Sequence, residues 1–203
     1  IDGVDIEVPE GTTILDAAKK IQVEIPTLCY HPDLHPRASC GICVVKVNGK
    51  MLRACCTPAE EGMDIITRDP EIIETRRTIL KLELSHHPNE CLTCIRNECC
   101  ELQSSASTFG LRERTFKNII PSKEEMPADD STKCIVLDPR KCILCGRCVE
   151  VCQTIQNVWA LAFLDRSIDT HVAPAGDLPL ADTPCIKCGQ CTAHCPTGAL
   201  SEY

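Results

Sequence analysis

The chain has 203 residues, of which 18 are cysteine, and a formal net charge of −8. It is too long for the class of short secreted disulfide scaffolds, and its acidic, aromatic-poor composition argues against a nucleic-acid partner. The longest apolar run, residues 158–164, is far shorter than the roughly 20 residues of a membrane span, and residues 1–20 show no signal peptide. We therefore expect a cytoplasmic protein whose cysteines bind metal or carry redox chemistry.

Residues 1–66 are predicted to form a small α+β unit. Apolar and acidic residues alternate over residues 4–8, which favours a half-exposed strand. A threonine precedes an amphipathic stretch over residues 14–20, which predicts a capped helix. Two apolar runs, residues 43–47 and 50–54, are separated by a loop containing Asn-Gly, which is a strong hairpin signal.

The first unit contains a candidate metal site with a wide gap, a C-x2-C pair and a distant fourth cysteine. Its members are Cys29, Cys40, Cys43 and Cys55. This order is typical of a 2Fe–2S site on a ferredoxin loop, although the first gap is longer than in the plant-type motif. Cys56 is an alternative to Cys55, and a zinc site or unligated core cysteines are the alternatives to a cluster.

Residues 67–127 are predicted to be mostly helical. A helical apolar pattern covers residues 72–84 and ends before a His-His-Pro sequence. A second, polar stretch around Leu102 also has helical character. Residues 121–130 are charged and contain proline, as is typical of a linker.

This second segment contains one histidine and three cysteines at metal-binding spacing. They are His87, Cys91, Cys94 and Cys100. The spacing alone leaves open a structural zinc site and an iron–sulfur cluster with one histidine ligand. His86 is an alternative to His87, and Cys99 is an alternative to Cys100.

Residues 128–203 contain an internal repeat of the motif C-x2-C-x2-C-x3-C. In bacterial ferredoxins this motif binds 4Fe–4S clusters, and the fourth cysteine of each copy ligates the other cluster. Gly146 and Gly189 lie where the tight loop needs a residue without Cβ. Two zinc knuckles are disfavoured, because zinc sites generally use two C-x2-C pairs with a long gap. The two predicted 4Fe–4S ligand sets are Cys142, Cys145, Cys148 and Cys195, and Cys152, Cys185, Cys188 and Cys191.

The other chemistry-bearing residues have simpler interpretations. We expect His31 and His35 to be solvated, His194 to lie near a cluster or at the surface, and Cys134 to be a small buried residue. Five basic residues are candidates to offset cluster charge: Arg53, Arg96, Lys141, Arg147 and Lys187. No G-x-G-x-x-G or P-loop motif is present, so no nucleotide site and no catalytic residue is assigned.

The order of these motifs resembles that of a known group of proteins. The stretches Cys-Gly-Ile-Cys-Val-Val-Lys-Val from Cys40 and Cys-Glu-Leu-Gln from Cys100, followed by two 4Fe–4S motifs, carry the resemblance. The chain is similar over essentially its whole length to the N-terminal electron-transfer region of FeFe hydrogenases, including the NAD-linked, electron-bifurcating type. It also resembles the large iron–sulfur subunit of complex I, NAD-linked formate dehydrogenases, and the small diaphorase subunit of NAD-coupled nickel–iron hydrogenases.

The resemblance implies an α+β chain of three domains. The first is a β-grasp 2Fe–2S ferredoxin domain over residues 1–66. The second is a small helical cluster domain with one histidine and three cysteine ligands, over residues 67–127, and the third is a two-cluster ferredoxin-like domain over residues 128–203. The resemblance also favours a 4Fe–4S cluster over zinc at His87. The implied cofactors are one 2Fe–2S cluster and three 4Fe–4S clusters.

The implied function is electron transfer between a flavin- or NAD-reactive partner of the diaphorase type and the catalytic centre of a hydrogenase, with ferredoxin as a further partner. The tandem motifs favour the hydrogenase and formate dehydrogenase branches, and the sequence after Cys195 is most similar to FeFe hydrogenases. The alternative is the same role in a formate dehydrogenase or complex-I-like enzyme. A stand-alone polyferredoxin and a zinc-binding interaction protein are less favoured. Because the chain begins with Ile1 and stops soon after a cysteine motif, we expect it to continue at both ends.

Overall fold

The structure is a computed structural model that describes residues 1–116 and 125–203. Its first part contains helix α1 (Ile14–Lys20) and strands β1 (Val44–Val47), β2 (Lys50–Arg53) and β3 (Ile65–Ile66). The strands are antiparallel in the order β2-β1-β3. The hydroxyl of Thr13 accepts a hydrogen bond from the Asp16 N–H and caps α1. The predicted helix and hairpin are therefore confirmed.

The predicted strand over residues 4–8 is wrong. These residues form no strand, and Val4 is 50% exposed. The N-terminal segment does not extend the sheet, in which β1 lies between β2 and β3. Its attachment is local instead: the Asp2 N–H donates to the Ile65 carbonyl, and the Asp2 carboxylate accepts from the Thr67 N–H.

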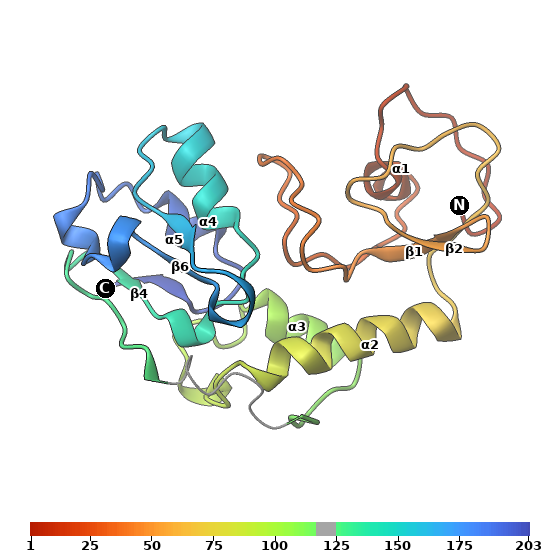
Figure 1. The fold of residues 1–203 in the computed structure, drawn as a ribbon. Coiled ribbons are helices and arrows are strands. Elements are labelled where there is room, and N and C mark those ends of the chain that lie inside the picture. The colour runs from red at the N-terminus through yellow and green to blue at the C-terminus, as the bar shows by residue number, and fades with distance from the viewer. Residues whose placement is uncertain (117–124) are drawn as a thin grey trace.

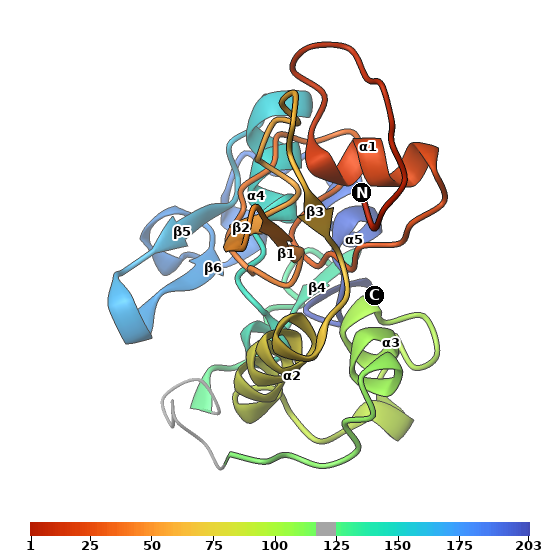
Figure 2. The same cartoon turned by 90° about the vertical axis from the view of Figure 1, so that its right-hand side faces the viewer.

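Two helices form the middle of the molecule, α2 (Pro70–Ser85) and α3 (Glu101–Thr108). Asp69 caps α2 with its side chain and Pro70 occupies the first turn, so the boundary agrees with local preferences. Figures 1 and 2 show α2 running from the N-terminal part toward the C-terminal part, with α3 beside it. The buried Arg76 on α2 donates to the carbonyls of Ile42 and Val44, which ties α2 to β1.

The C-terminal part is built around two short helices that pack against each other. Helix α4 (Arg147–Glu150) continues as a π-helical turn over Val151–Ile155, and α5 is Gln190–His194. Its strands are β4 (Ile135–Leu137) paired with β7 (Leu200–Glu202), and β5 (Ala162–Leu164) paired with β6 (His171–Ala173). Short 3₁₀ turns occur at Cys91–Thr93, Pro139–Lys141, Ser167–Asp169, Ala175–Asp177 and Leu180–Asp182.

The apolar interior forms three clusters, and one of them joins all three predicted segments. One cluster belongs to the N-terminal part and one to the C-terminal part. The third combines Leu28, Leu80 and Ile143 with three of the predicted ligand cysteines. Because the segments share this core, their cysteine loops are held in fixed relative positions.

The domain boundaries stay predictions, and part of the predicted linker lies outside the described residues. Cys134 is exposed, which corrects the expectation that it is buried, because its strand neighbours Ile135 and Leu137 fill the interior instead.

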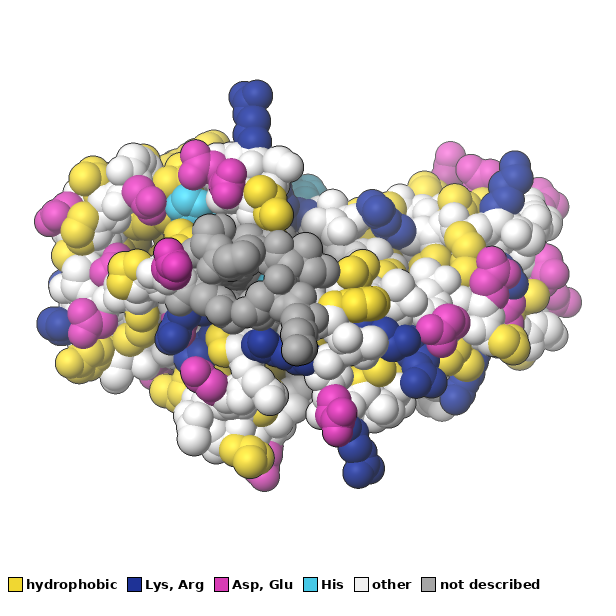
Figure 3. Space-filling model, turned by 60° about the horizontal axis from the view of Figure 1, so that its bottom comes forward, with side chains coloured by type: hydrophobic (Ala, Val, Ile, Leu, Met, Phe, Trp, Pro, Cys, Tyr) yellow, Lys and Arg dark blue, Asp and Glu magenta, His cyan; other side chains and the backbone are white. Residues whose placement is uncertain are grey.

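On the described part of the face in Figure 3, acidic, basic and apolar side chains are interspersed. Among the described helices, none has the length and apolar character needed to span a membrane.

Candidate iron–sulfur centres

Four thiols from the N-terminal part are joined in one group by three pairwise contacts. Cys29 bonds with Cys40 and Cys55, and Cys55 bonds with Cys43. The Cys40 thiol holds the pKa of Cys29 low, and the Cys55 thiol lowers the pKa of Cys43 to about 7. The pKa values of Cys40 and Cys55 are raised by the same bonds. Four thiols so close together ionise fully only beside a cation, so this donor set fits a metal centre.

The structure distinguishes neighbouring cysteines in two of the predicted sites. Cys55 is buried among the other thiols, whereas Cys56 is exposed and its Sγ points to the Arg53 carbonyl at 3.6 Å. Likewise Cys100 is buried, whereas Cys99 is exposed. The geometry therefore favours Cys55 and Cys100 as ligands.

His87 shares a cavity with the three cysteines predicted to accompany it. The lining of the cavity includes His87, Cys91, Cys94 and Cys100. The Nδ1 atom of His87 lies 3.1 Å from the Pro88 carbonyl, which only accepts hydrogen bonds. Nδ1 must therefore carry the proton, and Nε2 is the ring nitrogen that would ligate a metal. His86 does not line this cavity.

The repeat brings its cysteines together in the crossed arrangement predicted from the motif. One cavity is lined by Cys142, Cys145, Cys148 and Cys195. Burial raises the pKa of Cys145 to about 12 and holds that of Cys148 well above its usual range, so neither ionises at neutral pH without a positive charge beside it. The N–H of Leu144 donates to the Cys142 Sγ at 3.4 Å, as a loop around a sulfur ligand requires.

The second crossed set surrounds another cavity, whose lining includes Cys152, Cys185, Cys188 and Cys191. Cys152 lies in the π-helical turn after α4. Such turns re-aim one side chain out of helical register and are frequent at functional sites.

Gly146 and Gly189, which precede α4 and α5, have φ of +78° and +74°, so both loops need the freedom of glycine as predicted.

The donor chemistry of these sets fits metal centres held by thiolates. Sets of four cysteines, and a set of one histidine and three cysteines, are soft donors that suit iron–sulfur clusters and zinc. The spacing within the repeat is that of 4Fe–4S clusters.

One buried arginine lies close to residues of three predicted sites. Arg147 is 3% exposed and donates to both carboxylate oxygens of Glu101, at 2.6 and 2.7 Å. Burial acts to lower the pKa of Arg147, but the bonds to Glu101 outweigh it and raise the pKa. The same guanidinium acts electrostatically on Cys145 and Cys29, and Glu101 directly follows Cys100.

A second contact joins the His87 loop to the end of α5. Arg96 donates to the carbonyls of Thr192 and Cys195. A Cβ atom on Gly198 would lie 2.8 Å from the Cys94 Sγ, so these two segments touch. Among the other basic residues singled out, Lys141 lines the His87 cavity, Arg53 bonds the Ala38 carbonyl and Lys187 is exposed.

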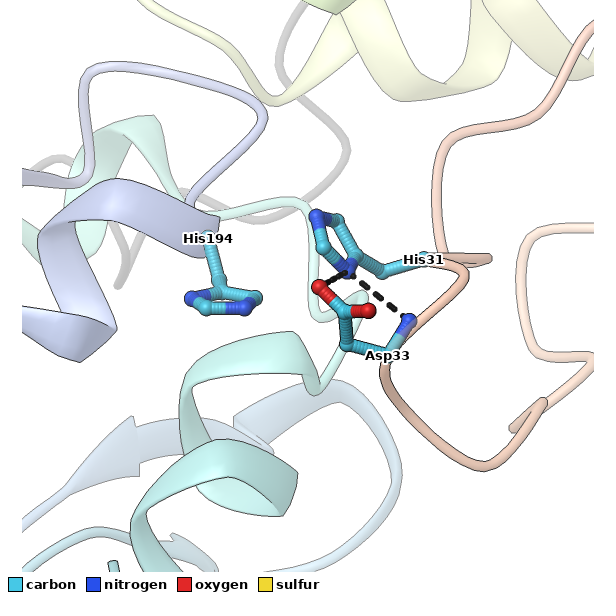
Figure 4. Close-up of side chains that lie close together, drawn as sticks. All are labelled: His31, Asp33 and His194. Carbon is cyan, nitrogen blue, oxygen red and sulfur yellow. Dashed lines mark hydrogen bonds and ion pairs between the residues drawn. The ribbon is translucent and has the colours of Figure 1, made fainter. Parts of the chain in front are cut away.

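Two histidines have contacts that the sequence did not indicate. The rings of His31 and His194 lie 4.4 Å apart between centroids, so His31 is not simply solvated (Figure 4). His171 is 7% exposed and its ring contacts Asp177 at 3.3 Å. The partners are remote in sequence or lie in irregular turns, where no periodic signal exists.

Family models match three parts of the chain. Residues 1–70 match the 2Fe-2S iron-sulfur cluster binding domain, and residues 76–115 match the NADH-ubiquinone oxidoreductase-G iron-sulfur binding region. Residues 135–154 and 183–201 match the 4Fe-4S binding domain. The chain therefore contains 2Fe–2S and 4Fe–4S binding domains in a mixed helix and strand fold.

Two curated relatives and one solved structure are similar over nearly the whole chain. The NADP-reducing hydrogenase subunit HndD of Solidesulfovibrio fructosivorans is 42% identical over all of this chain and 35% of its own length. One subunit of the NADH-quinone oxidoreductase of Rhizobium meliloti is 36% identical over all of this chain and 24% of its own length. A crystal structure of an NAD⁺-reducing [NiFe]-hydrogenase in the H2-reduced state has a chain with TM-score 0.88 and 31% identity, covering 97% of this chain and 82% of that one. The chain thus spans about a third or less of the length of these two curated relatives.

Proposed function

The protein belongs to the family of iron–sulfur electron-transfer proteins that includes the matched chain of the NAD⁺-reducing [NiFe]-hydrogenase. From this membership we propose that it carries electrons to or from the catalytic centre of a hydrogenase. The observation that carries the proposal is the presence of four separate donor sets, three of which contribute a cysteine to the core that joins the segments, while the fourth packs in the C-terminal cluster. All the recognisable chemistry of the chain is one-electron transfer, so the H2 site and the nicotinamide or flavin site belong to other parts of the enzyme.

We assign one cluster to each donor set. A 2Fe–2S cluster in a β-grasp fold takes the thiols around Cys29, and a 4Fe–4S cluster takes His87 with its three cysteines. Two further 4Fe–4S clusters take the two crossed sets of the repeat. When bound, the clusters supply one-electron storage, and the chain sets their reduction potentials through ligand type, hydrogen bonds and burial. The ligands are Cys29, Cys40, Cys43, Cys55; His87, Cys91, Cys94, Cys100; Cys142, Cys145, Cys148, Cys195; and Cys152, Cys185, Cys188, Cys191.

The contacts among these residues support a branched electron path that meets at the Cys142 set. Arg147 links this set to Cys29, and Gly198 and Arg96 link it to the His87 loop. The paired helices α4 and α5 link it to the second set of the repeat. Each of the other three donor sets therefore has a direct structural connection to the Cys142 set.

Exposed apolar residues beside two of the outer donor sets support contact with partners there. Ile186 is 61% exposed between Cys185 and Cys188, and Leu92 and Ile95 are 89% and 64% exposed in the His87 loop. We propose that one of these surfaces faces the catalytic centre and the other a diaphorase-type or ferredoxin partner. Assembly in the cytoplasm stays part of the proposal.

The test is an assay of the purified complex that contains this chain, with H2 and with formate as electron donors. H2-dependent reduction of NAD(P)⁺ or ferredoxin, lost when Cys188→Ser removes one proposed ligand, would support the hydrogenase assignment. Formate-dependent activity with no H2 oxidation would replace it by the formate dehydrogenase alternative. A complex in which Cys188→Ser changes neither the activity nor any EPR signal would contradict the electron-transfer role of this site.

A further inference from the structure

Two histidines and one aspartate meet between the N-terminal part and α5, outside all four donor sets. His31 and Asp33 come from the segment after Cys29, and His194 is the last residue of α5. One potential ligand atom from each lies within 4.8 Å of the other two. Figure 4 shows the His31 ring and the Asp33 carboxylate side by side, across from the His194 ring. The trio brings together residues 163 positions apart in the chain.

The hydrogen bonds of the two rings indicate which nitrogens carry lone pairs. His194 Nδ1 lies 2.8 Å from the Gln190 carbonyl, so Nδ1 carries the proton and Nε2 offers its lone pair. A ligand histidine typically has its other ring nitrogen bonded to a carbonyl in this way. His31 Nδ1 accepts from the Asp33 N–H at 3.3 Å and lies 3.7 Å from its carboxylate. A cation bound at this nitrogen would take the place of that long hydrogen bond.

We propose that His31, Asp33 and His194 bind one late first-row divalent cation, with Zn²⁺ as the preferred ion. Two imidazoles and one carboxylate are a common zinc donor set, with ligand distances of about 2.0–2.2 Å, and a water completes the tetrahedron. Around such an ion the ligand atoms stand roughly 3.3 Å apart, so binding draws the three groups closer by up to about 1.5 Å. Asp33 has a side chain that is 75% exposed and can make this movement without displacing packed neighbours.

The local charges are compatible with a cation at this place. Arg147 is near enough to act on His31, but its charge is balanced by the two bonds to Glu101. The ion would join His31, two positions after Cys29, to His194, directly before Cys195. It would therefore fix the N-terminal loop against α5, beside proposed ligands of two different clusters. The proposal does not depend on which enzyme the chain serves.

The test uses the cluster-loaded, oxidised protein under anaerobic conditions and titrates it with Zn²⁺ alone. We expect one saturable site whose zinc-edge X-ray absorption shows nitrogen and oxygen at about 2.0–2.1 Å and no sulfur at about 2.3 Å. Asp33→Asn and His194→Ala should each weaken binding at least tenfold. His35→Ala is the matched control, since His35 is an exposed histidine of the same loop outside the trio, and it should leave the affinity unchanged.

The iron content and visible spectrum of each variant establish that its clusters are intact. Asp33→Asn alters an exposed side chain, so it tests the site even if His194→Ala fails to fold. Sulfur in the zinc coordination shell would overturn the proposal and assign the ion to a cysteine site. Equal affinities of Asp33→Asn, His35→Ala and the unaltered protein would also overturn it, as would the absence of a saturable site.

Discussion

Replacing Gly198 by alanine should disrupt a cluster whose four proposed ligands all lie in another segment. Gly198 belongs to the C-terminal part, and its φ is outside the left-handed region, so alanine adds a methyl group without backbone strain. That methyl carbon would lie 2.8 Å from the Sγ of Cys94, a proposed ligand of the His87 cluster. The substitution therefore tests both the contact and the ligand assignment.

The size of the overlap decides the outcome. Ordinary contact begins at 3.4 Å, so the sulfur must move by about 0.6 Å or more. Metal–ligand distances are generally held within about 0.2 Å, and overpacking a well-filled site typically costs about 1–3 kcal/mol. Lys141 and Arg96 lie at 3.4 and 3.7 Å on the other sides of the methyl group and limit its escape. We expect loss of about four iron atoms per chain and of one EPR signal.

The assay compares Gly198→Ala with Gly189→Ala after anaerobic purification, by iron analysis and by EPR at graded potentials. Gly189 is the control, since its added Cβ would meet nothing closer than 3.9 Å but its φ is +74°. Alanine there costs roughly 1–2 kcal/mol of backbone strain in the loop of the Cys185 cluster. The two variants should therefore weaken different signals. If Gly198→Ala keeps all its iron and every signal, Cys94 is not a ligand in this geometry.

Three further outcomes follow from the site geometry. Arg147→Met removes a positive charge near Cys145 and Cys29, so it should lower the midpoint potentials of the two clusters proposed there. An EPR-monitored redox titration with Arg147→Lys as the control measures this shift, and unchanged potentials would argue against the electrostatic role. Cys55→Ser should abolish the 2Fe–2S signal and Cys56→Ser should keep it, and the reverse result would exchange the two assignments. Burial acts to lower the pKa of His171, but its hydrogen bonds to a backbone carbonyl and to Asp177 outweigh burial and raise the pKa. Protonated His171 therefore stabilises the fold below the ordinary histidine pKa, and this contribution is lost as the pH rises through the raised pKa. Asp177→Asn should therefore lower the free energy of unfolding at about pH 6 by less than about 1 kcal/mol, because Asp177 is exposed, and should have no effect at about pH 9. Equal effects at both pH values, measured by denaturant unfolding, would refute this linkage.

Local sequence signals predicted the elements that depend on local chemistry. Helix α1 has the predicted bounds because a capping threonine and an apolar face specify it. The hairpin of β1 and β2 follows from its Asn-Gly turn. The strand predicted over residues 4–8 failed, because alternation does not determine whether a segment pairs with the sheet, and this segment is held through Asp2 instead.

The candidate ligands were predictable to a larger extent than the residues that connect them. Spacing within the repeat indicated the crossed pairing of Cys152 and Cys195, which line different cavities. The pair of Arg147 with Glu101 joins residues 46 positions apart, and no pattern within either segment announces it. The contact of His31 with His194 is likewise a consequence of how the segments pack.

The most direct test of the four-cluster account is metal and sulfide analysis of the anaerobically purified chain without added zinc, combined with EPR on stepwise reduction. The account predicts about 14 iron and about 14 acid-labile sulfide per chain, with four distinguishable cluster signals. Zinc bound by sulfur at one or more equivalents per chain, with little iron and no cluster signals, would contradict it.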